Sequence, residues 1–419
     1  MKLKLSESQD QILLAAITCS LLVLELAFVR LLDILLFPRI TSTVITLSLF
    51  SFAIGGIYVA RLSGQRKDLK DFIESAIFKY LWVCLGSLFV ILMLRLPKNV
   101  VLTYDIYLFW FLLFLCLLIS LPMSIGGAIV VAFFTKSHKV AKTYLFDMLG
   151  AGIGVSLFYG LFSPLGPTGL VSLSLFFVLI VCWWIGSEKK HWVGAMLLLP
   201  LVGLPILERS YSIRPLVNKM GGLDQGKEID VSLWDQEGYL SLVSWNDDED
   251  RSAQKVFLYD GGSMASTIYS FDGDYERLRN AFMEDPLKHF SRLTVPLAHY
   301  LQRDSHQKAF IIGSGAGQEV KAALMYGASE VVAVDVSRTV LDLSRGLLSG
   351  FNGGIYNHPN VRVYYGEGRS TLYTLKETFD IIQMFSLYSS SSLSDNRGAL
   401  QAVYSLTVEA FKEYFFFFF

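Results

Sequence analysis

The chain has 419 residues, of which 53% are hydrophobic and 17% are charged, with a formal net charge of −1. This composition is too apolar for an ordinary soluble protein, and the near-neutral charge gives no reason to expect a nucleic-acid partner. The length allows two or three domains. All four cysteines lie in apolar stretches without metal-ligand spacing, so we expect small hydrophobic residues and neither a disulfide nor a metal site: Cys19, Cys84, Cys116 and Cys182.

The first half contains apolar stretches long enough to cross a bilayer. They lie at about 11–37, 41–60, 78–94, 106–134, 144–162, 168–186 and 191–207. The first stretch has the length of a full span and others follow it, so it is not a cleavable signal peptide. We predict that residues 1–207 form an α-helical transmembrane bundle of six or seven spans, with the lipid bilayer as partner.

The charges between these stretches predict their orientation. Segments 61–79 and 135–143 are rich in Lys and Arg and are expected to be cytosolic, whereas the uncharged loop 163–167 is expected to be external. The seventh stretch is short, contains Pro200 and Pro205, and has basic residues on both sides. These features favour a re-entrant or interfacial segment, which leaves the C-terminal half in the cytosol.

Charged residues and glycines within the spans lead to two further predictions, one about ion pairing or function and one about helix packing. Arg30 and Asp33 share a helical face in the first span, which also holds Glu25. They either pair near the end of the span or have a function at membrane depth. Gly150 and Gly154 form a G-x-x-x-G motif, which predicts close packing of another helix.

Residues 208–300 are more polar and predict a small β-rich lead-in. The runs 230–244 and 255–259 are typical of short strands, separated by the charged turn 246–251. A helix is predicted over 284–303 because apolar residues recur there on one side.

We predict that residues 301–414 form an α/β Rossmann-like domain, which contains a glycine loop. Apolar residues 309–312 predict a buried strand that ends in a loop containing Gly313, Gly315 and Gly317, and a helical pattern starts at Gln318. A second apolar run ends on Asp335, which completes a strand–loop–helix–strand unit. The glycines allow a ligand to approach the backbone closely, and a carboxylate at the next strand end can accept both ribose hydroxyls.

The glycine spacing helps to choose the ligand. A dinucleotide motif needs a third glycine or alanine where Gln318 stands. The G-x-G-x-G spacing is the one usual in S-adenosylmethionine-binding folds of the methyltransferase type. A glycine-rich turn without ligand and an NAD site remain alternatives.

The rest of the domain predicts two more strands. A helix at 338–348 leads to a third strand at 361–365, and a fourth strand at 379–384 precedes a helix at 396–414. A doubly wound sheet needs further strands, so we expect an incomplete domain that ends in a low-complexity phenylalanine tail at 415–419.

This half resembles the spermidine synthase family, a branch of the class I S-adenosylmethionine-dependent methyltransferase fold. The resemblance rests on IIGSGAGQEV, VVAVDVS, HPNVRVYYGEGRSTL and FDIIQ, with YDGG at 259–262 fitting the family's N-terminal strands. The membrane half is similar to bacterial multi-span proteins of spermidine synthase-like type, through LLVLELAFVRLL, LPMSIGGA and YLFDMLGAGIG. The resemblance implies a bacterial inner membrane, and the charge pattern described above favours a cytosolic α/β domain.

The resemblance also implies a set of binding residues for S-adenosylmethionine or its decarboxylated form. The glycine loop would cradle the methionine end of the ligand, Asp335 would hold the ribose, and Glu367 with Gly368 would lie near the adenine. Gln383 would supply a neutral hydrogen bond or a purely structural one. The full set is Gly313, Gly315, Gly317, Gln318, Asp335, Glu367, Gly368 and Gln383.

One departure from the family pattern affects the predicted chemistry. Aminopropyl transfer in the family uses an aspartate after the fourth strand to deprotonate the attacking amine. In this chain that position holds Phe385, and the later acid of the family's motif is Tyr388. A phenylalanine accepts no proton, so the catalytic base is unassigned, with Asp260 and Asp395 as the acids remaining nearby.

Two functions are therefore open. The first is a membrane-embedded transferase that moves an aminopropyl or methyl group from the nucleoside donor to an unidentified acceptor. If the group is methyl, proximity and orientation do most of the work without a strong base. The alternative is a non-catalytic nucleoside-sensing domain that regulates a transport-like membrane domain.

Overall fold

The computed structural model describes two compact units, Met1–Gly221 and Gly222–Phe419. Each unit has its own core. The described residues are 7–36, 38–64, 69–94, 106–185, 200–207, 228–235, 238–245, 254–260, 264–284, 295, 297–384 and 404–418.

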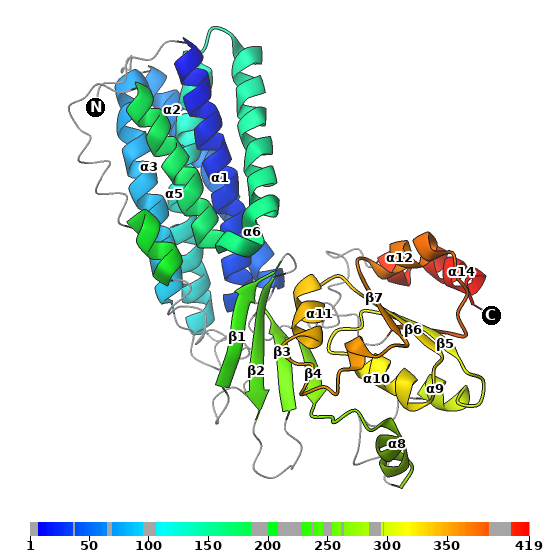
Figure 1. The fold of residues 1–419 in the computed structure, drawn as a ribbon. Helices are drawn as coiled ribbons and strands as arrows, with labels where there is room; N and C mark the ends of the chain where they lie inside the picture. Colours follow the sequence, from blue (N-terminus) through cyan, green and yellow to red (C-terminus); the bar gives the residue numbers. More distant parts are fainter. Residues whose placement is uncertain are drawn as a thin grey trace. The chain divides into compact units, whose positions relative to one another are not determined.

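Long apolar helices build the first unit (Figure 1). They are α1 (Glu7–Leu35), α2 (Pro38–Gly64), α3 (Leu69–Met93), α5 (Ile106–Lys136) and α6 (Val140–Ile185). All five are long and apolar enough to cross a membrane, judged by length and composition. A shorter helical segment covers 200–207, within the seventh predicted stretch.

Two loops expected from the sequence are largely helical. The predicted external loop 163–167 lies inside α6, where only Gly166 leaves helical geometry (φ 69°) between Pro164 and Pro167. The fifth and sixth predicted spans are thus the two arms of α6. The predicted basic loop 61–79 is wrong in extent, because α2 continues to Gly64 and α3 begins at Leu69. A helix can extend past its apolar stretch when its polar end residues reach water, which a hydropathy pattern misses.

Glycines allow the helices of this unit to approach closely, as the G-x-x-x-G motif predicts. A Cβ on Gly150 would lie 2.3 Å from the carbonyl oxygen of Ala15, and one on Gly154 would lie 2.8 Å from that of Cys19. Both contacts join α6 to α1, so close packing at this motif is confirmed. The guanidinium of Arg30 lies 5.5 Å from the ring centre of Phe162 on α6.

The second unit begins with an antiparallel sheet. Its strands are β1 (Glu228–Trp234), β2 (Tyr239–Trp245), β3 (Gln254–Tyr259) and β4 (Met264–Tyr269), in the order β1-β2-β3-β4. The first three match the strands expected from the sequence, whereas β4 was not predicted. Residues 285–294 and 296 of the predicted helix 284–303 lie outside the described residues. Next to them the structure has α8 (Tyr275–Glu284), which ends at the predicted start, and α9 (Leu297–Leu301).

A parallel sheet forms the rest of this unit. Its strands are β5 (Lys308–Ile312), β6 (Glu330–Asp335), β7 (Val361–Tyr365) and β8 (Ile381–Met384). The helices are α10 (Gln318–Met325), α11 (Arg338–Arg345), α12 (Gly368–Leu375) and α14 (Val408–Phe416). The strand order is β7-β6-β5-β8, with every pair parallel. The order reverses between β5 and β8, and ligands of such folds bind at this point, outside the carboxyl ends of the strands.

Both faces of the two central strands are buried, which explains the unbroken apolar runs in β5 and β6. On one face Ile311 and Ala333 pack with α10 and α11 residues. On the other face Phe310 and Val332 pack with residues of α12 and α14. Phe417 of the phenylalanine tail is only 6% exposed and belongs to this second core, whereas Phe415 and Phe416, the last residues of α14, are exposed. The described part of the predicted tail, residues 415–418, is thus helical up to Phe416.

The antiparallel sheet packs against the glycine loop and α11. Leu242 and Phe257 of the sheet share a core with Ala316 of the loop and Val340 of α11. The sheet therefore supports the loop from one side, and β4 supplies polar groups to it.

Candidate functional site

The predicted binding residues gather at the carboxyl ends of the parallel strands. Gly313 follows β5, Asp335 ends β6, and Glu367 follows β7. Because β5 is flanked by β6 and β8, the glycine loop lies at the point where strand order reverses.

Positive φ angles define the glycine loop. They are 71° at Gly313, 48° at Gly315 and 86° at Gly317. A side chain in this region of φ is strained. A Cβ on Gly317 would also lie 2.3 Å from Cδ1 of Ile355.

A tyrosine holds the loop from behind. The hydroxyl of the buried Tyr356 donates toward the carbonyl oxygens of Ser314 and Gly315, at 3.0 and 2.8 Å. Burial raises the pKa of Tyr356 well above its usual value, so it remains a neutral donor. The loop conformation is thus fixed by its own chain before any ligand binds.

Asp335 connects the loop to the second strand. Its Oδ2 accepts the Gly315 N–H at 2.7 Å, and its Oδ1 accepts the Ser337 N–H at 2.8 Å. Each carboxylate oxygen can accept a second hydrogen bond, so both still have capacity for a ribose hydroxyl. Burial raises the pKa of Asp335, although the two N–H donors oppose this shift.

Two further buried carboxyl groups lie near Asp335, and the sequence analysis predicted neither of them as a site residue. Asp235, just after β1, accepts the Ser337 hydroxyl at 2.6 Å. Glu319 lies in the first turn of α10, and burial, followed by the nearby Asp335 charge, raises its pKa to about 7. The position of Glu319, directly after the loop, was a usable signal, whereas Asp235 is brought in by a strand 100 residues earlier in the chain.

Glu367 and Gly368 lie where predicted but are used by the chain itself. The Glu367 carboxylate caps α12 by accepting the N–H groups of Arg369 and Ser370 at 3.0 and 2.7 Å, and it also accepts the Ser405 hydroxyl at 3.0 Å. Burial tends to raise the pKa of Glu367, but these donors outweigh it and the net shift is downward. A Cβ on Gly368 would lie 2.3 Å from Cγ2 of Ile312, so glycine lets α12 approach β5.

Both predicted glutamines form hydrogen bonds within the protein. Gln383 uses both its amide nitrogen and its amide oxygen, whereas Gln318 uses its nitrogen. The Gln383 amide donates to the Val295 carbonyl at 2.9 Å, and its Oε1 lies 2.6 Å from Nε2 of His299 on α9. The Gln318 amide donates to the Thr267 carbonyl of β4 at 2.9 Å. Gln383 therefore connects β8 to α9, whereas Gln318 connects the loop to β4.

The residues expected to carry the acceptor-side chemistry are only partly described. Phe385, Tyr388 and Asp395 lie outside the described residues. Asp260 accepts the Tyr239 N–H at 2.9 Å and so joins the ends of β2 and β3.

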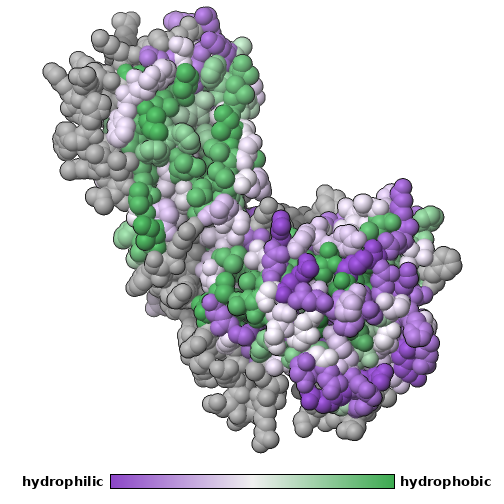
Figure 2. Space-filling view, in the orientation of Figure 1, coloured by the Kyte–Doolittle hydropathy of each residue, from purple (hydrophilic) through white to green (hydrophobic). Residues whose placement is uncertain are grey.

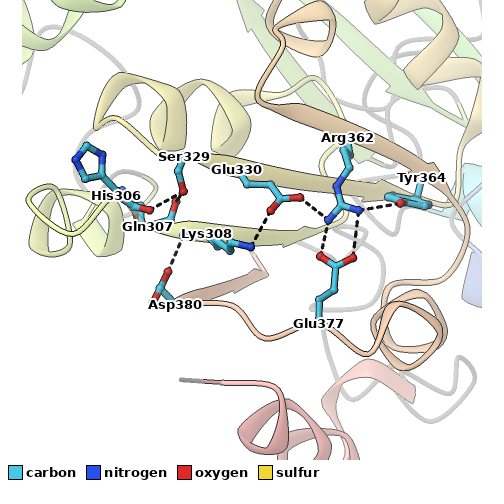
Figure 3. Close-up of polar contacts among 9 residues, drawn as sticks. All are labelled: His306, Gln307, Lys308, Ser329, Glu330, Arg362, Tyr364, Glu377 and Asp380. Carbon is cyan, nitrogen blue, oxygen red and sulfur yellow. Dashed lines mark hydrogen bonds and ion pairs between the residues drawn. The ribbon is translucent and has the colours of Figure 1, made fainter.

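The opposite, amino-terminal edge of the parallel sheet carries an ion-pair ladder (Figure 3). Glu330 lies between Lys308, at 3.2 Å, and Arg362, at 2.5 Å. Arg362 also holds Glu377 with both terminal nitrogens, at 2.5 and 3.2 Å. These charges join β5, β6 and β7 at the edge away from the glycine loop, so we assign them to stability and not to the site.

Comparison with known proteins agrees with this geometry. Residues 287–405 match the spermine/spermidine synthase domain family. A polyamine aminopropyltransferase of Archaeoglobus fulgidus is 28% identical over 134 residues, which cover 32% of this chain and 46% of the relative. A spermidine synthase of Schizosaccharomyces pombe is 31% identical over 136 residues, covering 30% of this chain and 45% of the relative.

The C-terminal part of the chain is spermidine synthase-like. The chain spans just under half the length of each of these relatives, and their similarity covers about a third of its own length. The matched region contains the glycine loop, Asp335 and β8. All of the predicted binding residues, from Gly313 to Gln383, thus lie within the region that carries the similarity.

Proposed function

We propose that the second unit binds decarboxylated S-adenosylmethionine and transfers its aminopropyl group to an amine acceptor. The observation that carries the proposal is the pairing of Gly315 and Asp335 at the strand-order reversal, within the region that matches the spermine/spermidine synthase domain family. The named activities of the two relatives supply the choice of donor and reaction.

The proposed reaction is a displacement at carbon. The lone pair of the acceptor amine forms a bond to the aminopropyl carbon next to the sulfonium. The carbon–sulfur bond breaks, its electron pair stays on sulfur, and methylthioadenosine leaves. The acceptor nitrogen loses one proton, which must go to water or to a basic group.

The described residues contribute mainly binding and orientation. Asp335 accepts the ribose hydroxyls, and its bond from Gly315 couples ribose binding to the loop conformation. Tyr356 keeps the loop in place through two carbonyls, so the donor meets a preformed surface. Holding donor and acceptor in a reactive geometry accounts for a large part of a bimolecular rate enhancement.

Release of methylthioadenosine from the decarboxylated donor tests the proposal. The detergent-purified chain is incubated with that donor and a panel of di- and triamines, and the nucleoside product is quantified. We expect amine-dependent release, and a loss of about tenfold or more in kcat/KM for Asp335→Asn, because an amide accepts ribose hydrogen bonds without the charge. Amine-dependent release that is equally fast in Asp335→Asn contradicts the assigned role.

A second candidate is nucleoside binding without transfer. Phe385 at the family's base position favours it, since phenylalanine cannot take the proton from the attacking amine. Binding of the nucleoside without amine-dependent product would select this function over the transferase.

We also propose that the first unit lies in a bilayer. Its helices expose large apolar side chains over wide areas, and Figure 2 shows hydrophobic residues across the visible face of these helices. Examples from α5 and α6 are Phe109, Trp110, Phe114, Leu117, Leu149 and Ile153. Lipid contact removes this surface from water.

Alkaline extraction tests the bilayer proposal. We expect the chain to stay in the membrane pellet after a high-pH wash, because spanning helices are not held by charge. Complete release into the supernatant contradicts the proposal.

A further inference from the structure

A threonine hydroxyl joins α1 to α6 inside the first unit. Thr18 Oγ1 lies 2.8 Å from the carbonyl oxygen of Leu14, one turn earlier on α1, and 2.9 Å from Oδ1 of Asp147 on α6. A hydroxyl has one proton to donate, and a backbone carbonyl can only accept. The Thr18 proton can therefore serve only one of these two contacts.

The contact between Thr18 and Asp147 needs a proton from Asp147 if the hydroxyl donates to Leu14. Threonine side chains inside helices donate to the carbonyl four residues earlier, and the Leu14 contact is the shorter of the two. Two oxygens at 2.9 Å repel each other unless one of them carries a hydrogen. With a protonated carboxyl, Asp147 donates to Thr18, Thr18 donates to Leu14, and each hydrogen has an acceptor.

No cation balances Asp147 within the described part of the first unit, where Thr18 supplies its one hydrogen bond. Lys136 of α5 is paired with Asp10 at 2.7 Å, and Lys142 of α6 lies 6.0 Å from the ring centre of Phe146. The titratable groups at this end of α1, α5 and α6 are Asp10, Lys136, His138, Lys139, Lys142 and Tyr144. A carboxylate inside a bilayer is costly without a partner, and protonation removes its charge.

The helices α1 and α6 begin at the same end of the unit. Ala15 lies against Gly150 and Cys19 lies against Gly154, so the two helices run side by side in the same direction. Asp147 is about two turns after the start of α6 at Val140, and it is half-buried. The carboxyl is therefore inside the helix pair but close to the end at which both helices begin.

Polar side chains occupy the turns between Asp147 and that end. Thr143, one turn before Asp147, is buried, and its hydroxyl lies 2.6 Å from that of Ser137 in the connection between α5 and α6. On α1, Gln11 is 3% exposed, and neither atom of its amide has a partner among the described residues. Gln11 precedes Thr18 by seven residues and so shares its face of the helix. In proteins, bound water satisfies buried polar groups of this kind.

We propose that Asp147 is a proton-binding site at membrane depth in the first unit. Its carboxyl is protonated at rest and exchanges its proton with water through the polar segment that contains Gln11 and Thr143. When the proton leaves to water, the Thr18 hydroxyl turns from Leu14 to the carboxylate, so the bond between α1 and α6 stays and reverses its direction. The site rests on the proposed place of this unit in a bilayer, and it is independent of the donor site in the second unit.

Infrared spectroscopy of the full chain in phosphatidylcholine vesicles tests the proposal, because a protonated carboxyl has a carbonyl stretch that a carboxylate lacks. Spectra are recorded at about pH 7, where Asp and Glu side chains in water are ionised. Asp147→Asn removes the acid, and Thr18→Val removes the acceptor at nearly constant shape. Asp10→Asn is the matched control, because Asp10 is paired with Lys136. Glu25→Gln separates the contribution of the other acid in the middle of α1.

We expect the carbonyl band of one protonated carboxyl to be present in the wild type, absent from Asp147→Asn and unchanged in Asp10→Asn. In Thr18→Val the band should remain and move to higher frequency, because the acid O–H has lost its acceptor. Far-ultraviolet circular dichroism shows that each variant keeps its helices. An Asp147→Asn spectrum identical to that of the wild type overturns the proposal.

Carbodiimide labelling gives a second readout that needs no variant. Dicyclohexylcarbodiimide dissolves in lipid and reacts with protonated carboxyls. The acid O–H adds across a C=N bond, and the acyl group then moves to nitrogen to give a stable N-acylurea. Peptide mapping of the wild type after reaction at about pH 7 should place an adduct on Asp147 and none on Asp10.

A wild-type chain without an adduct on Asp147 also overturns the proposal. Neither negative result touches the bilayer proposal or the transferase proposal, because alkaline extraction and release of methylthioadenosine measure those separately.

Discussion

The backbone of Gly317 turns through the left-handed region (φ 86°) directly before α10. Its missing side chain leaves room for Ile355, whose Cδ1 would lie 2.3 Å from an added Cβ, and for Tyr356, at 3.0 Å. Loop geometry and core packing therefore both require glycine at this residue.

Gly317→Ala should lower the free energy of unfolding of the second unit by about 3 kcal/mol, the sum of backbone strain and overpacking. Thermal unfolding of the detergent-solubilised chain, followed by near-ultraviolet circular dichroism, measures the change. Gly350→Ala is the matched control, because a Cβ there meets nothing within 4 Å, and it should shift stability by about 0.5 kcal/mol or less. A Gly317→Ala variant as stable as the control would show that the loop is not held against Tyr356.

At this scale the sequence predicted which residues reach the strand ends but not what they bind. Asp335 and the three glycines follow from strand and loop patterns, which are local. The hydrogen bond from Ser405 to Glu367 and the bond between Gln383 and His299 depend on neighbours far along the chain. The partners of the loop on β4, Ser266 and Thr267, depend on a strand that the sequence did not predict.

At the scale of elements, Arg362 links its own strand, β7, to β6 and to the segment before β8, at the amino-terminal edge of the parallel sheet. Its nitrogens contact Glu330 on β6 and Glu377 before β8, and Glu330 also contacts Lys308 on β5. The side chains are about a quarter to a half exposed, so water screens the pairs. A network of this kind is worth about 1 kcal/mol or less.

Arg362→Met should destabilise the second unit by about this amount near neutral pH. The hydrogen bond from Arg362 lowers the pKa of Glu377 below its usual value of 4.5. A carboxyl with a lowered pKa in the folded state contributes stability above 4.5 and loses it as the pH falls through the lowered value. The difference between wild type and variant should therefore shrink as the pH falls from about 5 toward 3.

Urea unfolding at a series of pH values measures this difference. Arg338→Met is the control, since its pair with Asp342 is 3.6 Å long and its side chain is 74% exposed. A wild-type advantage that stays constant down to pH 3 would contradict a role for the Glu377 charge.

Element predictions succeeded where the pattern was long or the strand was buried on both faces. Strand β6 contains the predicted apolar run and ends on Asp335 as expected, and its last five residues are buried. The errors lie at helix ends and at β4, whose sequence MASTIY is short and rich in small polar residues. Such a strand forms because β3 offers it a pairing edge, which is a tertiary cause.

At the scale of the whole molecule, the composition divides the chain as the structure does, into a helical unit and an α/β unit. The apolar fraction predicted the first, and the strand–loop–helix–strand pattern predicted the second. The proposed arrangement places donor chemistry in the second unit and attachment to a bilayer in the first. The central claim is that the edge formed by the glycine loop and Asp335 binds a nucleoside.

Calorimetric titration of the detergent-purified chain with methylthioadenosine tests that claim most directly. This probe carries the ribose and adenine without a charged tail, so it reports on the Asp335 edge alone. We predict measurable binding by the wild type and a loss of about tenfold or more in Asp335→Asn, with thermal unfolding showing that the variant is folded. Equal affinity of wild type and Asp335→Asn, or no binding by the folded wild type, would contradict the assignment of a nucleoside site to this edge.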